Sequence, residues 1–580
     1  MQAGAIELIE KSNDLVVMGH VGSVVNFVRN AQDGFVLNCH HAITSLKHHC
    51  QITEVDLVRA WFDNPKGLIE ELAAPFSLCG RRHGREAFSV LTDRYGLAHT
   101  YGFQGKGVCA ISSSALLLGR VFQQDIDLNA VGEFAHLGHY LGCATALKNV
   151  RKSAPGHSLD MHRGRLSSTL IFPNIAVENV DTTGYTRDGE DILRESVQVY
   201  VDAYPKCNIE LSGGVDSRLI LAGVPKSQRK NHLAVTLGAK NSADVKIASQ
   251  IANQNGMQHK IIDIGCSETD DPDCMIEQLH QASLRHDHAV NPIDKLAIER
   301  VRSKIGYEPR LSGQNGEIAR GFYYPGQPLD GSFKPGDFNR LVQWRLMGGD
   351  TANRSVFNGV FLNEARSSLS ANAFSLLQPT ESWPLSLDRF YLEQRMQRWC
   401  GSAVSAACSE RAIMMPFFNP QFVEWSMMSP AREKAGSRLA CSLICRLDPE
   451  LASLPFDSGA TPLQLTRSGV GRKASDAFNL GRKSAKRLFE RATGKSRHNL
   501  GTRSITELLE RGGIASKLDW NLMHSTGIFD HEYAEKLATG RLTNDRATLG
   551  FLTALDYTMK YLKKPVVAGP IKIIERHSQP

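Results

Sequence analysis

A six-residue turn rich in small side chains most constrains how this chain can fold. Residues 209–211 form a short apolar segment, residues 212–217 read Ser-Gly-Gly-Val-Asp-Ser, and an apolar helical run follows from Leu219. At such a turn the backbone N–H groups of the helix start point outward and can stabilise an anion. This order therefore predicts an α/β domain with an anion site at the carboxyl end of a strand.

The side chains of this turn indicate which ligand it can bind. Gly213 and Gly214 let the backbone close around an anion, while Ser212 and Ser217 can donate hydroxyl groups to it. Asp216 can hold a magnesium ion. The complete string is typical of loops that bind the pyrophosphate of ATP, and it predicts cleavage between the α- and β-phosphates. The alternative is an ordinary strand–turn–helix corner, which needs neither two hydroxyls nor a carboxylate.

The residues after the turn alternate between strand and helix patterns. Apolar runs at 233–237 and 260–264 predict two further strands, and residues 242–255 predict a helix that begins with a Ser cap and ends before Gly256. A helix is also expected over 186–204, and residues 340–460 are expected to be mostly helical. The pattern predicts a parallel, doubly wound sheet.

The N-terminal part of the chain has a different pattern. Short apolar runs at 14–18, 34–37, 88–91 and 107–111 are bounded by Gly, Asn or Asp. Short strands separated by such turns favour an antiparallel sheet domain over residues 1–170.

Composition sets the broad class. The 580 residues carry 67 Lys and Arg against 60 Asp and Glu, a net charge of +7. No run of about 18 apolar residues occurs, so no membrane-spanning helix is expected. The N-terminus lacks the basic start and apolar core of a signal peptide. The 12 cysteines have no repeating spacing, which fits a reducing compartment, and a cytoplasmic location is predicted.

One segment concentrates positive charge. Residues 467–497 are rich in Lys and Arg, with only Asp476 and Glu490 opposing them. A solvated stretch is the simpler interpretation, and a site for an anionic partner is the alternative. Aromatic residues are sparse there, with only Phe478 and Phe489, which disfavours a nucleic-acid partner.

Several motifs, in the same chain order, resemble those of the asparagine synthetase family. They are Asp-Arg-Tyr-Gly at 93–96, Ala-Pro-Gly at 154–156, the turn at 212–217, the strand at 233–238, and Leu-Ser-Gly-Gln-Asn-Gly-Glu at 311–317. The resemblance spans roughly residues 70–460.

The resemblance implies an α/β protein in several parts. An N-terminal Ntn-type antiparallel sheet sandwich is followed by a doubly wound parallel-sheet ATP-pyrophosphatase domain with a helical C-terminal part. The expected boundaries are 1–175 for a degenerate class II glutamine amidotransferase-like domain, 186–460 for the ATP-pyrophosphatase domain, 461–500 for a basic linker and 501–580 for a helical extension.

The resemblance also implies an activity. In this family a carboxylate attacks the α-phosphorus of ATP, pyrophosphate leaves, and ammonia or an amine attacks the acyl-adenylate. ATP and Mg²⁺ are the expected cofactors. The expected partners are a small-molecule or peptide carboxylate and an amine or ammonia. A homodimer is compatible with the sequence, which carries no signal for the oligomeric state.

The implied site residues fall into three groups. The nucleotide-binding group is Ser212, Gly213, Gly214, Asp216 and Ser217, with Leu237 and Gly238 at the adenine; the metal ligands are Asp216 and Glu317; and the catalytic positions are Glu317, Arg438 and Gln314.

Three departures from the family pattern shape these expectations. Glutamine hydrolysis needs an N-terminal cysteine whose α-amine is its base, but position 2 is Gln2 and no Met-Cys pair occurs in the sequence. An inactive scaffold is therefore expected, as in the β-lactam synthetase branch. Gln314 replaces a glutamate of the second motif and cannot act as a general base. Arg438 lies where the family carries a lysine, which keeps the charge but changes its geometry.

Three alternatives stay open at this point. A lasso-peptide-type macrolactam synthetase normally keeps Gly-Gly-Asp in the second motif, which is absent here. A tRNA-modifying pyrophosphatase explains the basic segment but not the N-terminal sheet domain. A non-catalytic nucleotide-binding relative is favoured by Gln314 and opposed by the intact turn at 212–217.

Overall fold

The structure is a computed structural model of the whole chain. The residues that it describes are 6–11, 16–20, 26–30, 34–38, 43–52, 57, 61, 64–82, 87–172, 189–239, 242–266, 269–348, 350–377, 382–408, 410–457, 459–466, 500–564 and 574–575. The basic segment at 467–497 lies outside them, so its role stays a prediction.

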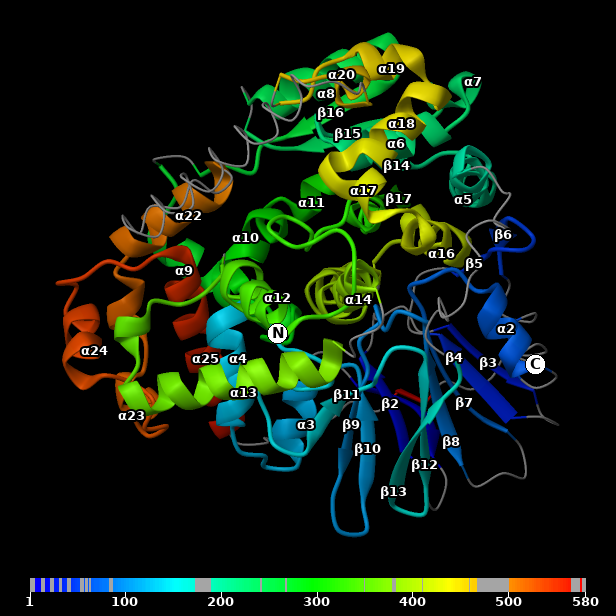
Figure 1. Cartoon of the computed structure of the whole chain (residues 1–580). Helices are drawn as coiled ribbons and strands as arrows, with labels where there is room; N and C mark the ends of the chain where they lie inside the picture. The colour runs from blue at the N-terminus through cyan, green and yellow to red at the C-terminus, as the bar shows by residue number, and fades with distance from the viewer. Residues whose placement is uncertain are drawn as a thin grey trace.

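A five-stranded parallel sheet lies in the upper part of the molecule as drawn in Figure 1. Its strands, in spatial order, are β16 (Gln258–Ile262), β15 (Leu233–Leu237), β14 (Asn208–Glu210), β17 (Arg310–Leu311) and β18 (Ile413–Met414). Every neighbouring pair is parallel. The predicted strand–helix alternation and parallel sheet are confirmed. The third strand ends at Ile262 rather than at 264, because Ile262 pairs with the last residue of β15 and no partner strand extends further.

Several helices surround this sheet, and the predicted cap of one of them is observed. The three nearest to the turn are α5 (Gly189–Ala203), α6 (Val215–Gly223) and α8 (Ala243–Gln254). The hydroxyl of Ser242 accepts a hydrogen bond from the Val245 amide at 3.3 Å, which confirms the predicted cap of α8. Helix α6 is buried from Ser217 to Gly223, because it packs against α5 and α18.

Antiparallel sheets form the N-terminal part, as predicted. A six-stranded sheet has the order β13 (Arg165–Leu170), β12 (His157–His162), β8 (Phe88–Thr92), β7 (Ser77–Arg82), β4 (Gly34–Asn38) and β3 (Asn26–Asn30). A three-stranded sheet has the order β10 (Cys109–Ser112), β9 (Tyr101–Gln104) and β11 (Val150–Lys152). The narrower Ntn-type assignment stays a prediction.

The C-terminal helices pack into the body of the molecule. Helix α25 (Arg546–Lys563) is buried along most of its length and contacts α3 (Ala115–Val121) and α4 (Leu128–Leu137). A short final strand, β19 (Ile574–Glu575), pairs with β1 (Ile6–Lys11), so the predicted helical extension also contains a strand. Figure 1 shows α25 beside α4, close to the N-terminal sheets.

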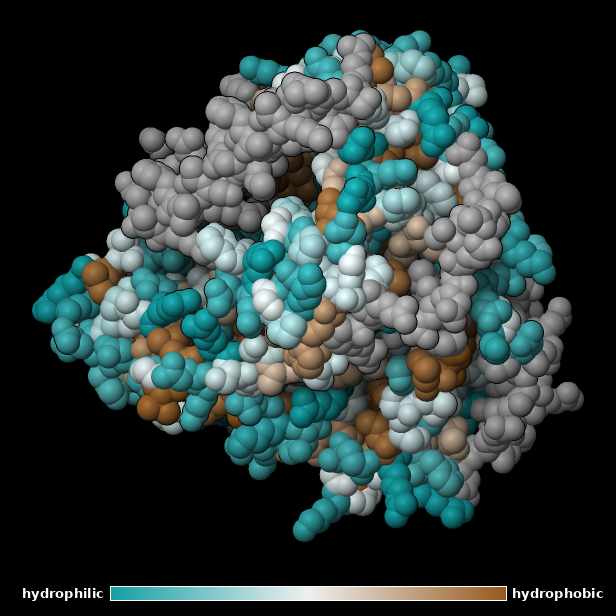
Figure 2. All heavy atoms as spheres, in the orientation of Figure 1, coloured by the Kyte–Doolittle hydropathy of each residue, from teal (hydrophilic) through white to brown (hydrophobic). Residues whose placement is uncertain are grey.

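The visible surface in Figure 2 is mostly hydrophilic, and its apolar side chains lie in separate groups. Among the described residues, no helix combines the length and the apolar character that crossing a membrane requires.

Candidate functional site

The order of the parallel strands creates one place where two loops can meet. From β14 the chain proceeds to β15 and β16 on one side, then crosses to β17 and β18 on the other. The carboxyl ends of β14 and β17 are therefore adjacent, and ligands bind at such switch points in open α/β sheets. The turn at 212–217 follows β14, and the second motif, which starts at Ser312, follows β17. The topology brings the two predicted motifs together.

Hydroxyl groups hold the first turn in shape. The hydroxyls of Ser212 and Ser217 lie 2.9 Å apart, and Ser217 Oγ accepts the Ser212 amide at 3.1 Å. Gly214 donates its amide to Ser212 Oγ at 3.1 Å. Gly214 is also the N-cap residue of α6, and because it has no side chain it leaves the first amides of the helix uncapped. The first-turn amides of α6 have no acceptor within the helix, so they remain the donors for an anion. The two serines thus shape the turn, in addition to their predicted contact with the nucleotide.

One amide of the turn is bound by a carboxylate of the protein. Gly213 donates its N–H to Asp244 Oδ1 at 2.6 Å, and burial raises the pKa of Asp244 above its ordinary range. Asp244 lies in the first turn of α8, directly after β15. The sequence places this aspartate on a helix, but no local spacing shows that it reaches across to the neighbouring loop.

Asp216 points from α6 into the second motif. Its Oδ2 accepts a hydrogen bond from Arg320 Nη2 at 2.6 Å, and the same nitrogen lies 3.5 Å from Glu317 Oε1. A Cβ atom on Gly316 would overlap the carboxylate of Asp216, and one on Gly313 would lie 3.1 Å from the Asp216 carbonyl carbon. Glycine is therefore required at Gly316, because any side chain there would displace the carboxylate.

Burial and neighbouring charges shift the titration of this group. Burial raises the pKa of Asp216 to about 7, Arg320 opposes this rise, and the charge of Glu317 adds to it. Burial lowers the pKa of Arg320, but the charges of Asp216 and Glu317 outweigh burial and raise it overall. The arginine therefore stays charged between two carboxylates.

Glu317 has a second partner, Tyr391. Tyr391 lies at the start of a π-helix, η4 (Tyr391–Cys400), and donates its hydroxyl to Glu317 Oε2 at 2.8 Å. The ring of Phe322 stacks on Tyr391 with their centroids 5.0 Å apart. The predicted catalytic carboxylate is therefore oriented by a buried tyrosine. Tyr391 was not predicted, because its contact with Glu317 depends on how η4 packs.

Gln314 and Asn315 anchor the second motif to the core. Gln314 accepts a hydrogen bond from the buried thiol of Cys400. Asn315 adopts a left-handed backbone conformation, with φ of 74°, and its Nδ2 donates to the carbonyl of Phe417 at 2.8 Å. These contacts fix the turn that carries Glu317. They assign Gln314 a structural contact; its predicted catalytic position stays a prediction.

Arg438 begins a helix beside the site. It is half-buried at the first position of α18 (Arg438–Leu447), which packs along α6. Burial raises the pKa of Cys441, one turn further along, and the charges of Arg320 and Asp216 also act on this thiol. Cys441 is therefore the residue of α18 that these charges reach. None of the ion pairs seen in the part of the chain that the structure describes includes Arg438.

Leu237 is the last residue of β15, and Gly238 follows it at the edge of the sheet where the turn lies. Both are half-buried, and the Gly238 amide donates to the carbonyl of Ile262 at 3.1 Å. A Cβ atom on Gly238 would lie 3.1 Å from Val245 Cγ2, so α8 approaches closely here. Their position beside the loop fits the predicted adenine contact, which stays a prediction.

A buried arginine ties the turn to a distant segment. Arg218 is fully buried and donates to the carbonyls of Leu454 at 2.6 Å, Pro455 at 2.9 Å and Gly213 at 3.3 Å. Its guanidinium also lies over the ring of Phe456. Because one side chain binds both segments, residues 451–455 and the turn are held as a unit.

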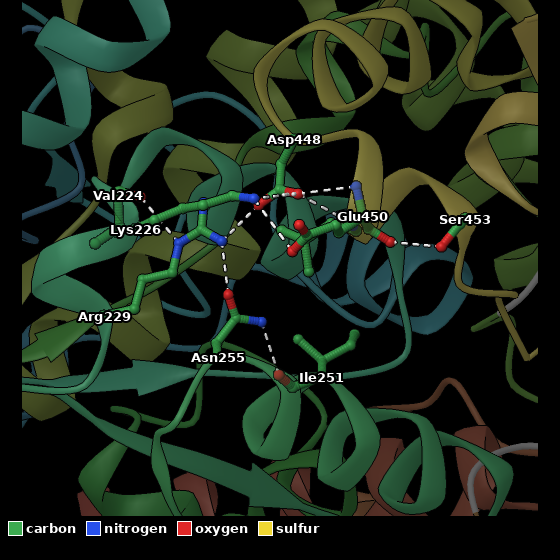
Figure 3. A network of polar contacts seen from close by, with 9 residues as sticks. Val224, Lys226, Arg229, Ile251, Asn255, Asp448, Glu450 and Ser453 are labelled. Carbon is green, nitrogen blue, oxygen red and sulfur yellow. Dashed lines mark hydrogen bonds and ion pairs between the residues drawn. The ribbon is translucent and has the colours of Figure 1, made fainter.

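A second network fixes that distant segment (Figure 3). Arg229 Nη1 donates to Asp448 Oδ2 at 2.5 Å and to Asn255 Oδ1 at 2.7 Å, and both charged side chains are almost fully buried. Asp448 also caps α19 (Pro449–Ser453) through the amides of Glu450 and Leu451. The pair thus joins α7 (Lys226–Arg229), α8 and α19 behind the turn.

The parallel sheet carries the turn at 212–217 at its switch point, where open α/β sheets bind their ligands. Residues 188–282 match the family model described as asparagine synthase, so this part of the chain is similar to the asparagine synthase family. The matched range contains α5, the turn and strands β14 to β16. No curated protein matches the chain.

The site combines the amides at the start of α6 with two carboxylates and an arginine. The free amides at the start of α6 suit a phosphate group, as the family implies. Within the described residues, no group of three or more His, Cys, Asp or Glu side chains converges. The two predicted metal ligands, Asp216 and Glu317, are bridged by Arg320. A guanidinium thus takes the place between the carboxylates where a cation is expected.

Proposed function

We propose that this chain is an ATP-dependent carbon–nitrogen ligase of the AMP-forming kind. It adenylates a small-molecule or peptide carboxylate with release of pyrophosphate, and then transfers the acyl group to ammonia or an amine. The observation that supports this most is the convergence of the two motifs at the switch point. There the N-terminus of α6 faces a cluster of one arginine and two carboxylates.

The roles of the residues follow from their positions. The α6 amides and the turn at 212–217 bind the pyrophosphate, and Leu237 and Gly238 lie beside the adenine. Glu317, oriented by Tyr391, accepts a proton from the attacking amine. Arg438, at the start of α18, stabilises the negative charge that develops on the phosphate. Mg²⁺ bound together with ATP would neutralise part of the charge of the phosphates, and Asp216 and Glu317 are the predicted residues that would hold it.

The nitrogen source is free ammonia or an amine of the second substrate. No Met-Cys pair occurs in the sequence to provide the nucleophile of a glutaminase. Release of glutamate from glutamine by the purified protein would overturn this part of the proposal.

Isotope exchange tests adenylation directly. The protein is incubated with ATP, labelled pyrophosphate and single carboxylates, beginning with aspartate and continuing through a panel of amino acids and peptides. We expect label to enter ATP with at least one carboxylate, and Asp216→Ala to abolish this. The control is Asp330→Ala, which removes an exposed carboxylate paired with Arg432. Exchange that survives in Asp216→Ala would remove the turn from the mechanism.

A second candidate is a nucleotide-binding protein without ligase activity. It is favoured by the contact of Gln314 with Cys400, which places an amide where the family has a catalytic carboxylate. This candidate predicts saturable ATP binding with no AMP release in the presence of any carboxylate and amine.

A further inference from the structure

We propose that Arg320 is a built-in counter-cation of the nucleotide site, so that ATP binds without a divalent metal ion. This inference rests on the proposed function, because it concerns how the same site neutralises the charge of the nucleotide. It assigns a binding role to a residue for which the sequence analysis predicted none.

The position of Arg320 supports the inference first. The residue directly follows a short 3₁₀-helix, η1 (Gly316–Ala319), in the second motif. One nitrogen, Nη2, lies 2.6 Å from Asp216 Oδ2 and 3.5 Å from Glu317 Oε1. These two carboxylates are the predicted metal ligands. A metal ion between them would lie against a guanidinium of the same sign of charge, so binding one would require Arg320 to move.

The N–H donors of Arg320 that have no protein partner also support the inference. A guanidinium carries five N–H donors, and only those on Nη2 are occupied by the two carboxylates. The Nε–H group is buried and has no hydrogen-bond partner. A buried N–H without an acceptor is costly, and an oxygen of a bound phosphate would satisfy it.

The nearby helix start supplies the complementary half of the site. Asp216 lies in the first turn of α6, so the arginine that contacts it is adjacent to the free amides of that turn. Arginine suits phosphate groups because its planar fork can form two parallel hydrogen bonds. Together the amides and the guanidinium offer hydrogen-bond donors to a phosphate group without a metal ion.

The first experiment measures nucleotide affinity of the wild-type protein alone. A fluorescent ATP analogue is titrated once in excess Mg²⁺ and once in excess EDTA. We expect the two dissociation constants to agree within about threefold, because the arginine provides the neutralising charge in both cases. Binding that weakens by more than about tenfold in EDTA would overturn the inference, since the metal would then be required.

The second experiment removes the guanidinium. In EDTA, Arg320→Leu is expected to weaken binding at least about tenfold, and Arg320→Lys to weaken it less. The matched control is Arg340→Leu, which removes a half-exposed surface arginine paired with Asp337. Without nucleotide, Mn²⁺ titrations followed by electron paramagnetic resonance should show tighter binding to Arg320→Leu than to wild type. Unchanged binding of both ATP in EDTA and Mn²⁺ would contradict the inference.

These outcomes separate the inference from the proposed function. ATP binding that depends fully on Mg²⁺ would contradict the role of Arg320 as a counter-cation but would leave the ligase proposal intact. If the protein binds no ATP in either Mg²⁺ or EDTA, both the role of Arg320 and the proposed function are contradicted. If Arg320→Leu does not fold, which circular dichroism will show, the wild-type titrations in Mg²⁺ and EDTA still decide.

Discussion

At the scale of single residues, the carboxylate of Asp216 connects the two motifs of the site. It leaves the first turn of α6, accepts a hydrogen bond from Arg320 and lies against Gly316. Each of these contacts makes a prediction that can be tested on its own.

The raised pKa of Asp216 predicts a pH dependence of stability. Because its pKa is about 7 in the folded protein and lower when unfolded, the folded state holds an extra proton between about pH 4 and pH 7. Its contribution to the free energy of unfolding therefore falls as pH rises through this window. Asp216→Asn removes the titration, so the variant should gain about 1 to 3 kcal/mol relative to wild type between pH 5 and pH 7.5.

Urea unfolding at both pH values measures this difference. Asp330→Asn, a change of an exposed carboxylate, serves as the control and should show no relative gain. A variant-to-wild-type difference that is the same at pH 5 and pH 7.5 would show that Asp216 does not titrate in this window.

Adding a side chain at Gly316 should cause a steric clash with Asp216. Gly316→Ala places a methyl group in the space of the Asp216 carboxylate and should lower the free energy of unfolding by about 1 to 3 kcal/mol. It should also weaken ATP binding, because Asp216 and Arg320 must shift. The matched control is Gly336→Ala, whose added methyl group meets nothing within 4 Å. If Gly316→Ala and Gly336→Ala have the same stability and the same ATP affinity, Gly316 does not pack closely against the Asp216 carboxylate.

At the scale of elements, the turn depends on helices that lie behind it. Arg218 binds the turn to residues 451–455, and the pair Arg229–Asp448 fixes α19, where that segment begins. The site is therefore held by contacts between α6, α7, α8 and α19 rather than by the turn alone.

The buried pair predicts an asymmetric response to mutation. Arg229→Met leaves the Asp448 carboxylate without its buried partner and should lower the free energy of unfolding by about 3 to 5 kcal/mol. The double change Arg229→Met with Asp448→Asn should recover part of this loss. Arg432→Met, which breaks an exposed pair, should cost less than about 1 kcal/mol. Chemical unfolding measures all three, and equal losses for the buried and exposed pairs would contradict the account.

Local patterns predicted the elements better than the contacts between them. Strand β15 was predictable because it is a short, mostly apolar run bounded by polar or turn-forming residues, whereas β14 (Asn208–Glu210) lies one residue before the predicted segment 209–211. The turn at 212–217 was predictable because its chemistry is contained in six consecutive residues. The contact of Tyr391 with Glu317 was not, because it joins positions 74 residues apart through the packing of η4. The reach of Asp244 to Gly213 was hidden for the same reason.

At the scale of the whole molecule, the N-terminal sheets and the C-terminal helices share a core. Buried side chains of β9, α4, α13 (Gly359–Leu377) and α25 form one apolar cluster. Buried polar contacts also join the two halves of the chain: Lys152 Nζ donates to Gln397 Oε1 at 3.0 Å, and Arg398 donates to the carbonyl of Ala144 at 2.6 Å. The molecule should therefore unfold as one cooperative unit.

Leu552 in α25 tests this cooperativity. It is fully buried in the shared cluster, so Leu552→Ala should lower the free energy of unfolding by about 2 to 5 kcal/mol. Thermal unfolding of the variant is followed by near-ultraviolet circular dichroism and by the loss of ATP binding. The midpoint temperatures of both transitions should fall together relative to wild type. Leu463→Ala, an exposed change, is the control. If only one of the two signals shifts, the halves unfold independently.

Hydrogen exchange with and without ATP tests the central claim most directly. If the nucleotide binds at the switch point, saturating ATP should slow exchange in peptides that span 212–223 and 311–322, where the α6 amides and Arg320 lie. Peptides from the antiparallel sheets should be unaffected. Saturating ATP that protects other segments and leaves both of these peptides unchanged would contradict the assignment of the site.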